Sequence, residues 1–268
     1  MPTPSRLRAD THVHFHDCFE EGAFLNAAAD ALCGDSATSG QIDAVLCLTE
    51  SYGANWFARL CDIESNASVG ESGWKLRPTD EENSVLVADS SSRALAIIAG
   101  RQIVCSGGLE VLVLGHKDMP EDGQPIRSVL QLVSDAGALP VLPWGFGKWL
   151  GQRGQVVADL ISNPPCHFLL GDNGGRLAML GEPKLFSTGR DSGFSILPGT
   201  DQFPFSWDCK RVGSYGIEWD GGLNPDSPFA SFKSIVLNGQ SQGRTFGSLE
   251  HLPAFFRNQV AIQLQRFA

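Results

Sequence analysis

Two histidines near the start of the chain, His12 and His14, are separated by one residue within the sequence Asp-Thr-His-Val-His-Phe-His-Asp at 10–17. Apolar and polar residues alternate over 6–15, which predicts a strand whose successive side chains point to opposite faces. Both histidines therefore project from one face, about 7 Å apart along the strand. Two neutral imidazoles at this spacing can bind one metal ion, and imidazole suits zinc, iron, nickel and copper.

A solvated polar strand face can carry the same His-x-His pattern, because short motifs also occur by chance. The composition of the next segment, 19–33, predicts a helix, so the histidines would lie where a strand enters a βα turn. Active sites of α/β barrels lie at this C-terminal end of the strands. The position of the pair therefore favours metal binding.

Most of the chain repeats a pattern in which a short apolar strand precedes a loop rich in Gly, Asp, Asn or Trp and then a helix. Strands that alternate with helices predict an α/β fold with a largely parallel sheet. Short β-prone segments near 74–105 indicate an antiparallel β insertion, and 249–265 has the apolar spacing of a final helix. We find no fixed repeat and no long linker, so we expect residues 1–268 to form a single domain.

The net charge of −10 and the isoelectric point near 5.0 argue against nucleic acid or an anionic membrane as a partner, because phosphate binding needs clustered Lys and Arg. A local basic pocket for a small anionic substrate is compatible with this average, and the final helix leaves a homo-oligomer open. The sequence contains no run of 18 apolar residues and no apolar signal segment at its start. Seven scattered cysteines without a Cys-x-x-Cys motif are typical of reduced thiols, so we expect a cytoplasmic protein.

Polar residues at the expected strand ends form the candidate site. They are His12, His14, Glu50, Glu110, His116, Asp172 and Asp201. Histidine and carboxylate ligands suggest zinc, manganese or iron, and such an ion lowers the pKa of a bound water. Each residue also has a structural alternative: the acids can cap a helix or pair with an arginine, and His116 can be an ordinary loop residue.

Three segments together resemble the polymerase-and-histidinol-phosphatase (PHP) domain, which is related to the amidohydrolases. Asp-Thr-His-Val-His resembles the opening His-x-His motif of that family. The segment 107–116, Gly-Gly-Leu-Glu-Val-Leu-Val-Leu-Gly-His, resembles its glycine–apolar–glutamate strand, and Leu-Pro-Gly-Thr-Asp at 197–201 resembles its late Gly-Ser-Asp motif. The resemblance implies a distorted TIM-like (β/α)7–8 barrel that hydrolyses phosphate esters. It also implies that His12, His14, Glu110 and Asp201 are metal ligands.

The chain departs from the family pattern at three places. Leu-Thr-Glu ending at Glu50 stands where the family has Thr-Asp-His, and two further family histidines are missing after Val141 and Asp201. We therefore expect one or two ions, with Glu50 or His116 as replacement ligands and with Asp201 or Glu50 as catalytic groups. The alternative is a catalytically degenerate barrel that binds a ligand or partner.

Two glycine-containing loops can bind the substrate. Trp144-Gly-Phe-Gly-Lys-Trp149 combines an aromatic wall at Trp144 with a cation at Lys148. Gly171-Asp-Asn-Gly-Gly-Arg176 places Arg176 as a clamp for a phosphate or carboxylate. The same residues would otherwise serve as rim packing and as a tight turn.

Overall fold

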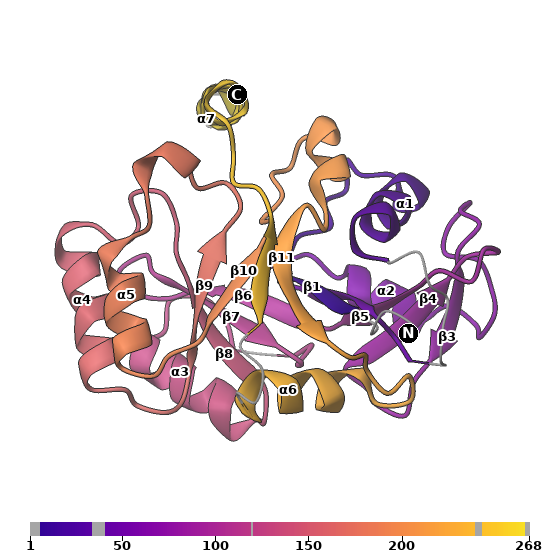
Figure 1. Cartoon of the computed structure of the whole chain (residues 1–268), viewed down its shortest axis with the longest axis horizontal. Helices are drawn as coiled ribbons and strands as arrows, with labels where there is room; N and C mark the ends of the chain where they lie inside the picture. Colours follow the sequence, from indigo (N-terminus) through magenta and orange to yellow (C-terminus); the bar gives the residue numbers. More distant parts are fainter. Residues whose placement is uncertain (1–5, 34–40, 119, 239–242, 266–268) are drawn as a thin grey trace.

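The computed structural model describes residues 6–33, 41–118, 120–238 and 243–265, with two β-sheets surrounded by helices (Figure 1). The strands of the first sheet are β1 (Arg6–Val13), β2 (Ala44–Leu48), β3 (Lys75–Pro78), β4 (Ser84–Ala88), β5 (Ala94–Ile98), β11 (Tyr215–Asp220) and β12 (Arg244–Gly247). Those of the second are β6 (Gly100–Val104), β7 (Glu110–Leu114), β8 (Leu139–Pro143), β9 (Leu169–Asn173) and β10 (Ile196–Gly199). Their orders are β12-β11-β1-β2-β5-β4-β3 and β10-β9-β8-β7-β6.

Both sheets are mixed, which supports the predicted α/β class. In the first sheet β1, β2 and β5 are parallel and β11 is antiparallel to β1. In the second sheet β8, β9 and β10 are parallel, whereas β7 runs antiparallel to β8. The antiparallel pairs β3–β4 and β4–β5 lie within the predicted insertion, but β5 also pairs with β2 and so belongs to the main sheet.

On one side of the molecule the chain bends sharply from the first sheet into the second, because β6 begins only two residues after β5 ends. Gly100 lies at this bend. A Cβ atom at Gly100 would lie 2.1 Å from the Leu48 carbonyl oxygen and 2.5 Å from that of Val113. The close approach of the two strands therefore requires glycine at this position.

On the other side β1 lies beside β10 without a continuous ladder. The Thr11 hydroxyl donates to the Pro198 carbonyl at 3.0 Å, and the Asp201 N–H donates to the His12 carbonyl at 2.8 Å. We call this contact the β1–β10 seam. The hydrogen-bonded ladders form two separate sheets, so the expected closed barrel is not confirmed.

Three hydrophobic cores hold these layers together. The helices are α1 (Glu21–Leu32), α2 (Trp56–Cys61), α3 (Ile126–Asp135), α4 (Gly151–Ser162), α5 (Lys184–Asp191), α6 (Pro228–Asn238) and α7 (Leu252–Gln265). One core lies between the first sheet and α1 and α2, and another lies between the second sheet and α3, α4 and α5. The third fills the space between the sheets, where α6 contributes Phe229 and Phe232. In Figure 1 α6 lies below the strands of the two sheets.

The final helix is only partly buried. Phe255 packs against Phe146 at 5.3 Å between ring centroids. The exposed apolar side chains of α7 are spaced four residues apart and are Leu252, Phe256, Val260 and Leu264. Across the described residues, every helix is too short or too polar to span a membrane.

Candidate metal centre

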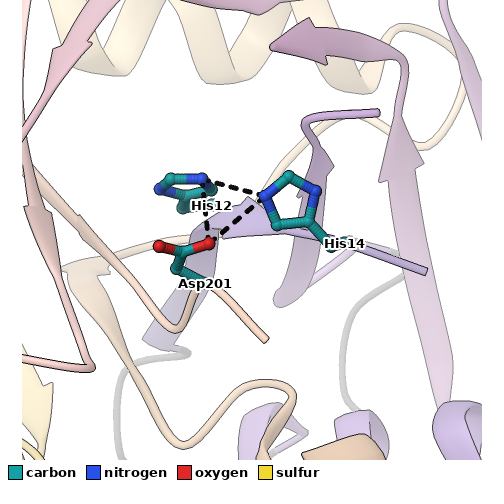
Figure 2. Close-up of side chains that lie close together, drawn as sticks. All are labelled: His12, His14 and Asp201. Carbon is teal, nitrogen blue, oxygen red and sulfur yellow. Dashed lines mark hydrogen bonds and ion pairs between the residues drawn. The ribbon is translucent and has the colours of Figure 1, made fainter. Parts of the chain in front are cut away.

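His12, His14 and Asp201 meet at the end of β1, across the β1–β10 seam (Figure 2). His12 lies in β1, His14 follows that strand, and Asp201 follows β10. The two Nε2 atoms are 3.2 Å apart, and Oδ1 of Asp201 lies 3.4 Å from the first and 3.2 Å from the second. Both histidines are buried, and the carboxylate is partly accessible. The two histidines lie side by side, as predicted, and Asp201 completes a three-residue cluster with them.

Backbone geometry places Asp201 against β1. Its φ angle is +55°, which is uncommon for a residue other than glycine and turns the chain sharply. Gly199, just before this turn, has no room for a side chain, because a Cβ atom would lie 2.3 Å from the His12 nitrogen. The Gly-Thr-Asp sequence therefore lets the carboxylate reach the two imidazoles.

A buried carboxylate, Asp10, fixes the same seam from within the protein. It accepts hydrogen bonds from the Thr200 N–H at 2.8 Å, the Thr200 hydroxyl at 2.6 Å and the Gly213 N–H at 2.9 Å. Burial raises the pKa of Asp10 to about 6, although these hydrogen bonds favour its charged form. The polar strand face expected from the sequence is thus largely buried.

The spacing of the three atoms fits a metal ion. Ligands 2.0–2.1 Å from a tetrahedral zinc ion are separated by about 3.3–3.4 Å. The observed separations of 3.2–3.4 Å match three corners of such a polyhedron. Two imidazoles and one carboxylate also form a donor set that divalent transition metals accept.

The protonation states of His12 and Asp201 also suit metal binding. Burial lowers the pKa of His12 to about 4, so the ring is neutral near pH 7. Burial alone would raise the pKa of Asp201, but the neighbouring His12 and His14 together with Lys148 bring it below its usual range. His12 and Asp201 are therefore in the deprotonated forms that metal binding requires.

Three amide side chains support the cluster, and the candidate list from the sequence contains none of them. Asn173 donates through Nδ2 to Oδ2 of Asp201, which leaves Oδ1 facing the histidines. Gln202 accepts from the His14 N–H at 3.0 Å, and Oε1 of Gln102 lies 3.2 Å from Nε2 of His12. Of the three, only Asn173 lies in a segment with a predicted role, the 171–176 loop that we expected to bind an anion.

Glu110 and Lys148 form an ion pair near the same end of the sheets. Because β7 is antiparallel to β8, Glu110 at its start lies near the loop that follows β8 and carries Lys148. The charge of Lys148 acts electrostatically on both His12 and Asp201. Glu110 itself is outside the three-residue cluster, so its expected role as a ligand gains no support from the geometry.

The same strand direction moves His116 away. Six residues of extended chain separate it from Glu110, which is roughly 20 Å. His116 lies in the turn after β7, where its Nδ1 accepts from the Asp118 N–H at 3.1 Å. Glu110 and His116 lie at opposite ends of β7, so they cannot both line one site, and the antiparallel pairing with β8 puts His116 at the far end.

Glu50 has structural partners. Its carboxylate accepts from the Phe57 N–H at 2.9 Å, near the start of α2, and from Arg101 at 3.4 Å. Arg101 also donates to the Ala54 carbonyl at 2.7 Å. These contacts match the helix-capping alternative considered for Glu50, which is not part of the three-residue cluster.

The other predicted substrate-binding residues are also engaged elsewhere. Arg176 is buried and forms two hydrogen bonds to Asp172, at 2.9 and 2.8 Å, and one to the Gly181 carbonyl. Tyr215 donates to the same Asp172 carboxylate at 2.6 Å. Trp144 packs against the core of the second sheet. Of the expected anion-binding cations, only Lys148 is placed near the cluster.

Comparisons with known proteins reveal similarity in structure alone. No protein-family model matches the sequence, and no curated protein matches it. The crystal structure of PsfC from Pseudomonas syringae PB-5123 aligns with a TM-score of 0.58 and 13% identity, covering 98% of this chain and 100% of PsfC. That of PfuEndoQ, a lesion-specific endonuclease from Pyrococcus furiosus, aligns with a TM-score of 0.55 and 9% identity, covering 90% of this chain.

The chain spans 57% of the length of PfuEndoQ. Identities this low establish a shared fold and do not transfer an activity. The prediction that excluded nucleic acid as a partner was wrong, because an endonuclease shares this fold. An acidic average charge was the wrong criterion, since a local site can bind phosphate whatever the net charge of the chain. The chain thus has the α/β fold of these two proteins and a candidate metal centre at a seam between its sheets.

Proposed function

We propose that the protein is a metal-dependent phosphoester hydrolase of a divergent PHP type, with its centre at His12, His14 and Asp201. The observation that carries this proposal is the convergence of two imidazoles and one carboxylate with metal-ligand spacing. A divalent ion held there would supply a nucleophilic water near neutral pH and polarise a phosphoryl oxygen.

Lys148 would bind the phosphate of the substrate. Its ammonium group is on the loop after β8 and is held by Glu110, beside the cluster. A fixed cation at that place would stabilise the negative charge that increases on the phosphoryl oxygens in the transition state. Glu110 would act by orienting Lys148, in place of the ligand role expected from the family.

Asp201 has two tasks in this proposal. Its Oδ1 faces the histidines as a ligand, and the carboxylate can accept a hydrogen bond from the attacking water and so orient it. Asn173 would keep the carboxylate in this orientation through Oδ2. A catalytic role for Glu50 would need its cap on α2 to break, so the proposal does not use it.

The first substrate to test is a nucleic-acid phosphodiester. Support comes from the shared fold with PfuEndoQ, which is a lesion-specific endonuclease. DNA strands with and without damaged bases, together with a chromogenic phosphodiester and a phosphomonoester, would define the substrate class.

The decisive experiment compares the wild type with His12→Ala/His14→Ala. We expect the wild type to bind close to one equivalent of Mn²⁺, Fe²⁺ or Zn²⁺ by elemental analysis and to hydrolyse a phosphoester, and the double variant to lose both properties. His116→Ala/His167→Ala is the matched control, because it removes two histidines outside the cluster. A wild type that binds no metal after incubation with these ions would refute the proposal. Metal binding without hydrolysis of any phosphoester would favour the degenerate, ligand-binding alternative.

A further inference from the structure

We propose that Gln102 is a fourth ligand of the centre and supplies a neutral oxygen. This inference rests on the proposed metal site and goes beyond it by completing the donor set. Gln102 is in β6, on the second sheet, whereas His12 is in β1, on the first.

The argument begins with the surroundings of Nε2 of His12. Three atoms surround it at nearly equal distances: Nε2 of His14 at 3.2 Å, Oε1 of Gln102 at 3.2 Å and Oδ1 of Asp201 at 3.4 Å. A neutral imidazole has only one N–H, and an amide or carboxylate oxygen has none to donate. The single proton of His12 can therefore satisfy only one of these three neighbours well. A cation bound to Nε2 of His12 would remove this competition, because the Gln102 oxygen could bind the same ion beside His14 and Asp201.

The backbone holds Gln102 in place for this role. The Gln102 N–H donates to the Glu50 carbonyl at 2.9 Å, and the Glu50 N–H donates to the Gly100 carbonyl at 3.1 Å. β6 is thereby fastened to the chain that leaves β2. Side chains alternate along a strand, so Arg101 turns toward Glu50 while Gln102 turns toward His12. Reaching the cluster therefore requires no rearrangement of the strand.

A neutral fourth ligand has two chemical consequences. The cluster contains a single carboxylate, so a divalent ion there keeps a net positive charge that attracts phosphate. Four protein ligands also fill a tetrahedral zinc site, whereas manganese and iron(II) accept more ligands and keep room for water. The donor set thus favours metals of higher coordination number for hydrolysis.

The test measures metal binding by the intact protein, with Mn²⁺ affinity from calorimetry and with Co²⁺ as a spectroscopic probe of the ligands. We expect Gln102→Leu to weaken Mn²⁺ binding about 10–100-fold, the size of effect seen on removing groups that support metal ligands. The same change should alter the visible absorption of bound Co²⁺, because one ligand is lost. Gln131→Leu, on α3, is the matched control and should leave both readouts unchanged.

Gln102→Glu provides a second variant that keeps the oxygen and adds a charge. We expect it to bind Mn²⁺ more tightly than the wild type and to alter the Co²⁺ spectrum, and this result decides the matter if Gln102→Leu fails to fold. An unchanged Co²⁺ spectrum in the variants would show that Gln102 is not a ligand, whatever the change in affinity, because a group that only orients His12 also lowers affinity. The inference would then be overturned while the hydrolase proposal stands. A wild type without any metal affinity would overturn both.

Discussion

At the scale of single residues, the sequence predicted the three residues that form the candidate cluster but not the amide side chains beside them. His12 and His14 follow from strand alternation, and Asp201 from its position after a late strand. Asn173 and Gln102 have no characteristic spacing, because their contacts depend on where β9 and β6 lie relative to β1. An amide that orients a ligand can come from any part of the chain, so only the folded structure identifies it.

Asn173 is expected to set metal affinity by holding Asp201. Replacing it with Ala removes the hydrogen bond to Oδ2 and frees the carboxylate to rotate. We expect a loss of metal affinity of about 10–100-fold, as for other groups that orient metal ligands. Calorimetric titration with Mn²⁺ measures this, and Asn163→Ala at the end of α4 serves as the control. Equal affinity in both variants would show that the seam alone fixes Asp201.

His12 should make the metal-free protein less stable in acid. Its folded pKa of about 4 lies below the unfolded value of 6.5, so stability is full above pH 6.5 and falls as the pH drops toward 4. Between pH 7 and pH 5 protonation of His12 lowers the free energy of unfolding by about 2 kcal/mol. Urea unfolding of chelator-treated wild type and His12→Asn should show this difference in pH dependence.

Asp10 must be considered in the same experiment because it acts in the opposite direction. Its folded pKa of about 6 is above the ordinary value of 3.8, so the cost of burying its charge decreases as the pH falls below 6. Asp10 is present in both proteins, so its effect cancels in the comparison. Parallel pH profiles would mean that folding does not lower the pKa of His12.

At the scale of elements, the direction of one strand decided which acidic and histidine side chains meet. The apolar run of β7 predicts a strand correctly, but strand direction depends on pairing with β6 and β8, which hydropathy does not encode. The antiparallel direction puts Glu110 beside Lys148 and His116 in a distant turn. The helices predicted over 19–33 and 249–265 correspond to α1 and α7, since helical periodicity is local.

The seam between β1 and β10 should be intolerant of any side chain at Gly199. A methyl group there would lie 2.3 Å from the His12 nitrogen and 2.5 Å from its Cβ, so β10 must shift away from β1. We expect Gly199→Ala to cost about 1–3 kcal/mol of unfolding free energy and to lower metal affinity. Urea unfolding and calorimetry measure the two effects.

Gly73→Ala is the control for this substitution, because a Cβ atom there meets nothing within 4 Å and its φ angle is not positive. A Gly199→Ala protein with the stability and affinity of this control would contradict the close packing of the seam.

At the scale of the whole molecule, the α/β class follows from alternating patterns and buried strands, whereas the division into two sheets does not. The bend at Gly100 and the seam at Gly199 depend on distances between distant segments, which no local pattern contains. The average charge was likewise a poor guide to partners, because binding depends on the groups at one site. Lys148 shows this, since it is a cation placed near the cluster of a protein with a net charge of −10.

The β1–β10 seam also sets the order of events while the chain is being synthesised. Thr200 and Gly213, which donate hydrogen bonds to Asp10, follow it in the sequence by 190 and 203 residues, and Asp201 is similarly far from both histidines. Contacts between such distant residues form late, because much of the intervening chain must be ordered first. The two histidines therefore remain without Asp201 until that distant segment has been synthesised, and the full cluster arises only when β10 docks against β1.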